Sequence, residues 1–254
     1  MIELDEIYQG LKSGQFLLEY QPIVALDDHR CWGAEALIRW QRDQHLVMPA
    51  DFIPLIESTP VSGMLTYWVI DRIADDLGEW LRAHRDVSIS VNVPPEILGR
   101  GGLEYAANKN GLLEIADQII LEITEEGIPD RLGLEALNTA HERTGVRIAL
   151  DDVSLSGANL ALLSRLAFDF IKIDRVLMDE LEHNGPGPAW LNGLSTLLQS
   201  NSLRVIAEGV ETAEQLDRLK AAGIPLAQGF ALSRPLNAER LKAFHAARAS
   251  GIAA

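Results

Sequence analysis

Short apolar runs rich in β-branched residues alternate with longer segments of helical periodicity, and this alternation constrains the fold more than any other feature. The runs predicted to be strands are Phe16–Val24, Cys31–Ile38, Val87–Val93, Ile119–Thr124, Arg147–Val153, Phe168–Asp174, Arg204–Glu208 and Pro225–Gly229. Apolar residues recur at helical spacing between them, for example in Met64–His84, Asp130–Thr144, Trp190–Gln199, Ala213–Ala222 and Ala238–Ala247. Strands that alternate with helices predict a mostly parallel sheet covered by helices.

The number and order of these segments predict an α/β fold, an irregular TIM-type (β/α)₈ barrel with its first strand antiparallel. Only Ala25–Arg30 separates the first two runs, which is too short for a crossover helix, so these two strands should form a hairpin. A doubly wound open sheet is the alternative, but no Gly-x-Gly-x-x-Gly turn follows an early strand. The 254 residues fit a single barrel domain over residues 1–254, with a core of about residues 15–245.

Acidic residues outnumber basic ones, with 37 Asp and Glu against 22 Lys and Arg, and the formal net charge is −15. This charge repels polyanions, so we expect neither a nucleic-acid polymer nor an anionic membrane as a partner. The one cysteine, Cys31, excludes an intramolecular disulfide and fits a reducing compartment. No signal-like segment and no run of 18 apolar residues is present, so we expect a cytoplasmic location.

Polar residues able to bind a cation or a phosphate stand where the predicted strands end. They are Glu35, Asn92, Glu122, Asp151, Asp152, Lys172, Glu208 and Gln228. In a (β/α)₈ barrel these strand ends converge, and crowded carboxylates stay ionised only if cations neutralise them. Oxygen ligands without His or Cys favour Mg²⁺ or Mn²⁺ over Zn²⁺. Taken singly, the aspartates could cap a helix and Lys172 could pair with Asp174, so the prediction depends on their coincidence.

Several motifs follow one another in the order typical of one protein family. They are Tyr20-Gln-Pro-Ile-Val24, Glu35-Ala36-Leu37, Val91-Asn92-Val93, Leu121-Glu-Ile-Thr-Glu125, Leu150-Asp-Asp152, Ile171-Lys-Ile-Asp-Arg175, Ala207-Glu-Gly-Val-Glu-Thr212, Gln228-Gly-Phe230 and Arg234-Pro235. With these motifs the chain resembles the EAL-type cyclic-di-GMP phosphodiesterases of bacteria. No single tripeptide would carry this resemblance, but the ordered set spans nearly the whole chain.

The resemblance implies that the barrel hydrolyses one phosphodiester of cyclic di-GMP to linear pGpG with two Mg²⁺ or Mn²⁺ ions. It assigns metal ligands, catalytic residues, substrate contacts and supporting residues. The implied metal ligands are Glu35, Asn92, Glu122, Asp151 and Asp152, and the implied catalytic residues are Glu35, Lys172 and Glu208. The residues implied to bind substrate or hold the cluster are Gln21, Arg39, Asp174, Gln228 and Pro235. The residues implied to support the site are Glu125 and Glu211. Ca²⁺ should permit binding but inhibit cleavage, because it accepts looser geometry. A homodimer, and regulatory or sensor domains or partners, are also implied.

The loop after the two aspartates departs from the family pattern, which usually reads Asp-Asp-Phe-Gly-Thr-Gly-Tyr-Ser-Ser-Leu. Here residues 151–160 read Asp-Asp-Val-Ser-Leu-Ser-Gly-Ala-Asn-Leu. Ser154 and Ser156 replace glycines, which allow positive φ, and Val153 removes an aromatic side chain. The change at residues 153–159 leaves three alternatives to full activity open: a weak phosphodiesterase, a cyclic-di-GMP receptor without turnover, and a module that contacts only proteins. A Schiff-base lyase using Lys172 is a remote alternative, because neighbouring carboxylates would keep this amine charged.

Overall fold

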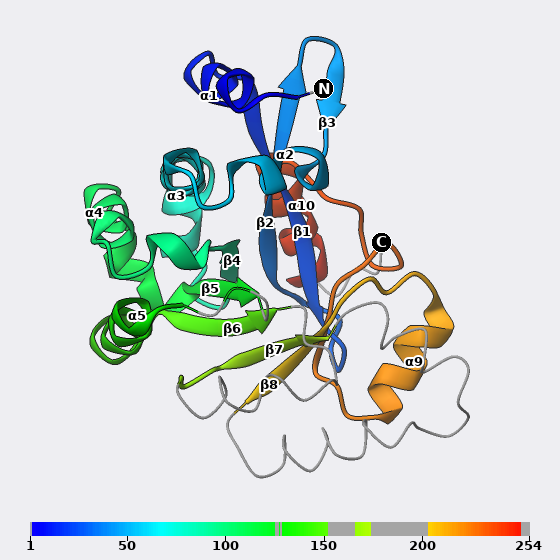
Figure 1. Ribbon diagram of the computed structural model, residues 1–254. Helices are drawn as coiled ribbons and strands as arrows, with labels where there is room; N and C mark the ends of the chain where they lie inside the picture. Colours follow the sequence, from blue (N-terminus) through cyan, green and yellow to red (C-terminus); the bar gives the residue numbers. More distant parts are fainter. Residues whose placement is uncertain (1, 125–126, 128, 152–165, 174–202, 250–254) are drawn as a thin grey trace.

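Eight strands close into a barrel, with β1 joining the two ends of the sheet (Figure 1). The computed structural model describes the chain except for residues 1, 125–126, 128, 152–165, 174–202 and 250–254. Around the barrel the strands are β1 (Phe16–Ala25), β9 (Leu226–Ala227), β8 (Arg204–Ala207), β7 (Phe170–Ile173), β6 (Arg147–Asp151), β5 (Ile119–Thr124), β4 (Ser88–Asn92) and β2 (Cys31–Arg42). This closed ring with helices around it confirms the predicted TIM-type barrel.

The first strand is the irregular element of the barrel. β1 runs antiparallel to both of its neighbours, β2 and β9, whereas the other strand pairs around the ring are parallel. The β1–β2 hairpin follows from the short Ala25–Arg30 connection, as predicted. β2 extends to Arg42 instead of ending at Ile38, because its last residues pair with β3 (His45–Val47). This end of the hairpin reaches past the barrel toward α1 (Leu4–Lys12) and α2 (Pro49–Ile56) (Figure 1).

The helices that surround the barrel begin and end at local sequence signals. They are α3 (Pro60–Ala83), α4 (Gly102–Lys109), α5 (Arg131–Thr144), α9 (Ala213–Ala221) and α10 (Ala238–Ala249), with short 3₁₀ turns η1 (Pro95–Ile97) and η2 (Leu112–Gln118). α3 begins four residues before the predicted Met64, because proline fits the first helical turn and the Thr59 hydroxyl accepts a hydrogen bond from Val61 N–H. The predicted helix at residues 190–199 lies outside the described part of the chain. Within that part, no helix combines the length and apolar character needed to cross a bilayer.

An apolar layer fills the barrel below the ends of its strands. Ile120, Ala149, Phe170, Ile206 and Leu226 come from five successive strands, are at most 3% exposed and pack against one another. Only the inside of a closed barrel brings these strands to a common contact. Because side chains alternate between the faces of a strand, the residues two positions further along also point inward. Those residues are Glu122, Asp151, Lys172, Glu208 and Gln228. The fold therefore places a polar layer directly on the apolar one.

Candidate active site and metal centre

The polar layer gathers side chains from seven strands at one end of the barrel. Glu35 lies within β2, and the others lie at or just after the C-terminal ends of their strands: Asn92 on β4, Glu122 on β5, Asp151 on β6, Lys172 on β7, Glu208 after β8 and Gln228 after β9. Hydrogen bonds and ion pairs link all seven side chains into one cluster. The structure thus brings together residues that are up to 193 positions apart in the sequence.

Lys172 lies at the centre of this cluster. Its Nζ is 3.2 Å from Glu35 Oε2, 3.0 Å from Glu122 Oε2, 3.2 Å from Asp151 Oδ1 and 2.7 Å from Glu208 Oε1. The Lys172 side chain is 1% exposed, so this ammonium group is desolvated and depends on the four carboxylates for its stability. One positive charge among four carboxylates leaves an excess of negative charge at the mouth of the barrel.

Two amide side chains fix the Glu35 carboxylate. Gln228 Nε2 donates to Glu35 Oε2 at 2.6 Å and to Glu208 Oε1 at 2.8 Å, while Asn92 Nδ2 donates to Glu35 Oε1 at 2.9 Å. Gly229 follows Gln228 where β9 passes close to another segment: a Cβ at this position would lie 2.2 Å from Val210 N. A larger residue at position 229 would displace the backbone that carries Gln228, so glycine here serves the cluster.

The crowding of charges shifts the pKa values of these groups in opposite directions. Burial raises the pKa of Glu122 well above its usual value, the Glu35 charge raises it further, and Lys172 offsets only part of this. Burial also raises the pKa of Glu208, to about 8. Burial opposes ionisation of Glu35 as well, but Lys172 and the two amides outweigh it and hold its pKa below the usual range. Burial disfavours the charged form of Lys172, yet the surrounding carboxylates raise its pKa well above normal.

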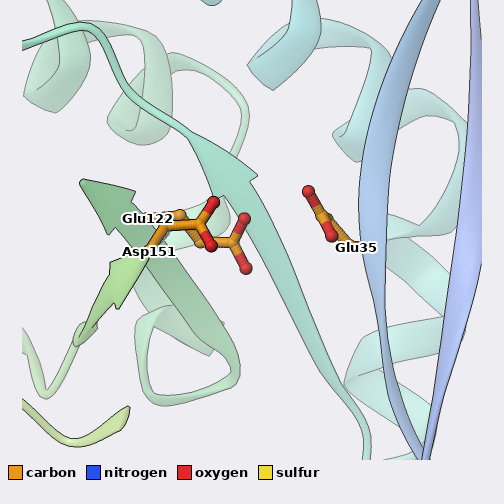
Figure 2. Close-up of side chains that lie close together, drawn as sticks. All are labelled: Glu35, Glu122 and Asp151. Carbon is orange, nitrogen blue, oxygen red and sulfur yellow. The ribbon is translucent and has the colours of Figure 1, made fainter. Parts of the chain in front are cut away.

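Three of the carboxylates fit a divalent cation. Glu35, Glu122 and Asp151 each offer an oxygen within 4.8 Å of the others, and Figure 2 shows Glu122 and Asp151 side by side with Glu35 facing them from β2. Neither buried oxygen of Glu122 accepts a well-aligned hydrogen bond from a described residue, although Oε2 lies 3.0 Å from the Lys172 ammonium. A carboxylate with unused acceptor capacity, in an oxygen-only set, suits a hard ion such as Mg²⁺ or Mn²⁺.

The predicted ligand contacts Gln21 and Arg39 lie on the β1–β2 hairpin. Gln21 is opposite Glu35 in the hairpin register, and its Nε2 donates to the Ser233 carbonyl at 2.6 Å. Arg39 is buried four residues further along β2, where its Nε donates to Glu19 Oε2 at 2.9 Å. Glu19 belongs to none of the sequence motifs, although its position two residues before Gln21 places both side chains on one face of β1.

The remaining predicted residues divide into those outside the described chain and those on its surface. Asp152, Glu125 and Asp174, and the altered loop at residues 153–159, lie outside the described residues. Pro235 is half-buried and Glu211 is exposed, with its backbone N–H donating to Gln215 Oε1. Their roles stay predictions.

A cavity of about 440 Å³ lies elsewhere, on the outside of the barrel. Its walls come from α3, α4, η2 and α5 and from the outer faces of β4 and β5, and they are mostly apolar, for example Ile73, Leu112 and Leu137. Its three charged lining residues are Glu104, Glu135 and Arg143, and none belongs to the polar cluster. The barrel mouth, with its convergent carboxylates, is therefore the better candidate for a catalytic site.

Comparisons with known proteins point to one family. The EAL domain profile matches residues 4–235. The bifunctional diguanylate cyclase/cyclic di-GMP phosphodiesterase MucR of Pseudomonas aeruginosa is 34% identical over 246 residues, which cover 94% of this chain and 36% of MucR. The probable cyclic di-GMP phosphodiesterase PdeB of Escherichia coli K12 is 32% identical over 92% of this chain and 45% of PdeB. The chain therefore spans less than half the length of these relatives.

A solved structure agrees with this similarity. The PaMucR phosphodiesterase in complex with c-di-GMP superposes on this chain with a TM-score of 0.82 and 34% sequence identity, and the match covers 94% of this chain and 98% of that one.

Proposed function

Because the chain belongs to the EAL domain family, we propose that it is a phosphodiesterase that hydrolyses one phosphodiester bond of cyclic di-GMP to give linear pGpG. One observation carries this proposal: four carboxylates from four strands surround Lys172 at 2.7–3.2 Å, and three of them can approach a common cation. The names of MucR and PdeB, and the c-di-GMP complex of PaMucR, support the choice of substrate.

We further propose two Mg²⁺ or Mn²⁺ ions as cofactors. Glu35, Asn92, Glu122 and Asp151 would hold the first, and Asp151 with Asp152 the second. Bound at this site, such ions would polarise a phosphoryl oxygen and lower the pKa of a coordinated water. The Glu122 oxygens without hydrogen-bond donors support this assignment. Ca²⁺ should occupy the same ligands and block turnover, because it prefers more ligands at longer distances.

Lys172 and Glu208 would handle the attacking water. The four carboxylates within 3.2 Å favour the charged form of Lys172, so this residue would donate hydrogen bonds and orient the water. Glu208 would then accept the water proton at a carboxylate oxygen. Gln228 would hold Glu208 and Glu35 in place through the two hydrogen bonds from its Nε2.

Substrate contacts would come mainly from the β1–β2 hairpin. Arg39 suits a phosphate, because the planar guanidinium donates two parallel hydrogen bonds to it. Gln21 would bind phosphate or guanine, and Pro235 and Asp174 would contribute nearby. Glu125 and Glu211 would support the loops of the site.

A receptor that binds cyclic di-GMP without cleaving it is the second candidate function. It is favoured by the sequence of residues 153–159, where serines replace two family glycines. A shift of about 1 Å at a catalytic site can lower the rate on the order of a hundredfold.

The setting of the activity is also proposed. We expect a homodimer in the cytoplasm that acts with regulatory or sensor domains or partners. The greater length of MucR and PdeB supports the expectation of additional regulatory domains.

A chromatographic assay of cyclic di-GMP tests the function. Purified protein with Mg²⁺ or Mn²⁺ should produce pGpG, and chelation or the Glu35→Ala substitution should abolish the product. Glu114→Ala provides a matched control, because Glu114 pairs with Arg82 at the surface. Absence of product over hours, together with tight binding in calorimetry, would favour the receptor; absence of both binding and product would contradict the proposal.

A further inference from the structure

The structure assigns a positioning role to Glu19, which nothing in the sequence motifs singles out. We propose that Glu19 fixes the orientation of the Arg39 guanidinium, so that the Nη1–Nη2 edge of this group faces a phosphate of the ligand. This inference rests on the proposed function, since it concerns how the same site binds a cyclic dinucleotide.

The hairpin register places Glu19 and Arg39 on the same face. Arg39 is opposite Leu17, Glu19 is opposite Leu37, and Gln21 is opposite Glu35. Alternate residues of a strand share a face, so Glu19 and Gln21 on β1 lie on the same face as Glu35 and Arg39 on β2. Glu19 and Arg39 are diagonal neighbours across the two strands, a separation that long side chains can bridge.

The contacts of Arg39 leave one edge of its guanidinium for a ligand. Nε donates to Glu19 Oε2 at 2.9 Å, and Nη1 donates to the Ile38 carbonyl at 2.9 Å. Among the described residues, none accepts a hydrogen bond from Nη2, and a guanidinium has five N–H donors in a fixed plane. With Nε held by Glu19, the Nη1–Nη2 edge remains for the two parallel hydrogen bonds that a phosphate accepts.

Burial explains why the partner matters. The Arg39 side chain is 6% exposed, whereas that of Glu19 is 31% exposed. A buried guanidinium without a counter-ion is unfavourable, so without Glu19 the Arg39 side chain would turn toward water or toward the excess of carboxylates at the barrel mouth. Either movement takes the guanidinium away from its position on the hairpin.

The distance along the strand gives Arg39 a role distinct from the metal cluster. Arg39 lies four positions after Glu35 on β2, which corresponds to about 13 Å at the usual rise of a strand. This separation would place Arg39 beside a part of the ligand away from the bond that is cleaved. Loss of its orientation should therefore weaken binding of substrate and transition state alike, which raises KM and leaves kcat nearly unchanged.

The test compares Glu19→Ala, Glu19→Gln, Arg39→Ala and the double variant Glu19→Ala/Arg39→Ala. Glu19→Ala should raise KM for cyclic di-GMP on the order of tenfold, the scale for a charge-assisted hydrogen bond that is partly exposed, with kcat within about twofold. Glu19→Gln keeps an acceptor for Arg39 Nε, so its KM should stay within about threefold of the wild-type value. In the Arg39→Ala background, Glu19→Ala should have no further effect, because Glu19 acts only through Arg39.

Binding in Ca²⁺ and the thermal unfolding of each variant complete the test. Glu114→Ala is the matched loss of an exposed carboxylate with an arginine partner. The proposal is overturned if Glu19→Ala leaves KM unchanged, if its effect adds fully to that of Arg39→Ala, or if it tightens binding, since Glu19 would then compete with the phosphate. A wild-type protein that neither binds nor cleaves cyclic di-GMP would instead overturn the proposed function, and the present inference with it.

Discussion

Replacing Lys172 with methionine tests the charge balance of the cluster. Methionine has a similar length, so the substitution removes the ammonium and little volume. The four carboxylates within 3.2 Å of Nζ then face one another without a cation. Removal of one partner from a buried ion pair costs about 3–5 kcal/mol of unfolding free energy. We expect a loss of this size for metal-free Lys172→Met protein at pH 8.

The loss should depend on pH, and the carboxyl pKa values set its sign. In the wild-type protein burial raises the pKa of Glu208 from the usual 4.5 to about 8, and it also raises the pKa of Glu122. Between pH 4.5 and pH 8 these carboxyl groups keep protons in the folded state that they have released in the unfolded state. Their contribution to the stability of the folded state therefore falls as the pH rises. Lys172 also holds the pKa of Glu35 below its usual range, so without Lys172 the pKa of Glu35 should rise and this carboxyl should take up a proton at mildly acid pH. At pH 5.5 protonation relieves the repulsion, and the loss should shrink to about 1–2 kcal/mol.

Urea unfolding followed by tryptophan fluorescence measures these differences at both pH values. Lys109→Met is the matched control, because Lys109 Nζ pairs with Asp71 at 3.1 Å on the surface and its loss should cost less than about 1 kcal/mol. Mg²⁺ at a hundredfold excess over its Kd should restore about 2.7 kcal/mol to Lys172→Met. A loss equal to that of the control, or one independent of pH, would refute the assignment of Lys172 as the counter-ion of the cluster.

Three further predictions concern the metal and the altered loop. Glu122→Gln should lower Mn²⁺ affinity at least tenfold in calorimetry, because it removes a buried charged ligand; unchanged affinity would exclude Glu122 from the site. Ca²⁺ should support cyclic-di-GMP binding but not pGpG formation, and full activity in Ca²⁺ would contradict the proposed role of Mg²⁺ or Mn²⁺. Val153→Phe, Ser154→Gly, Leu155→Thr and Ser156→Gly together should raise kcat, since glycine permits positive φ; a flat response would show that this loop does not limit turnover.

Much of the barrel could be predicted because its strands are marked by local patterns. The bounds of β5 agree with the prediction at both ends, Ile119 and Thr124, since turn residues flank a short apolar run. The extension of β2 to Arg42 could not be predicted, because it depends on pairing with β3 rather than on its own apolar residues. The start of α3 was predicted four residues too late, because its first turn has weak apolar periodicity, although Thr59-Pro60 is a helix start signal.

The identities of the clustered side chains could be predicted from the sequence, but the contacts between their atoms could not. Strand-end position and family resemblance indicate Glu122, Lys172 and Glu208, and the barrel topology predicts that they converge. Which atoms are in contact depends on packing across the barrel. The four carboxylates that contact Lys172 lie between 21 positions (Asp151) and 137 positions (Glu35) from it in the sequence. The Glu19–Arg39 pair depends on the exact register of the β1–β2 hairpin, which the short connection between the strands does not by itself determine.

Anomalous diffraction from crystals grown with Mn²⁺ and cyclic di-GMP would locate the metal ions directly. We expect Mn²⁺ at the barrel mouth, coordinated by oxygens of Glu35, Glu122 and Asp151. The Glu122→Gln protein, crystallised in the same way, should lose or weaken that signal. Mn²⁺ bound only at other residues of a well-ordered crystal, with these three carboxylates making no contact to it, would show that the cluster is not the metal site.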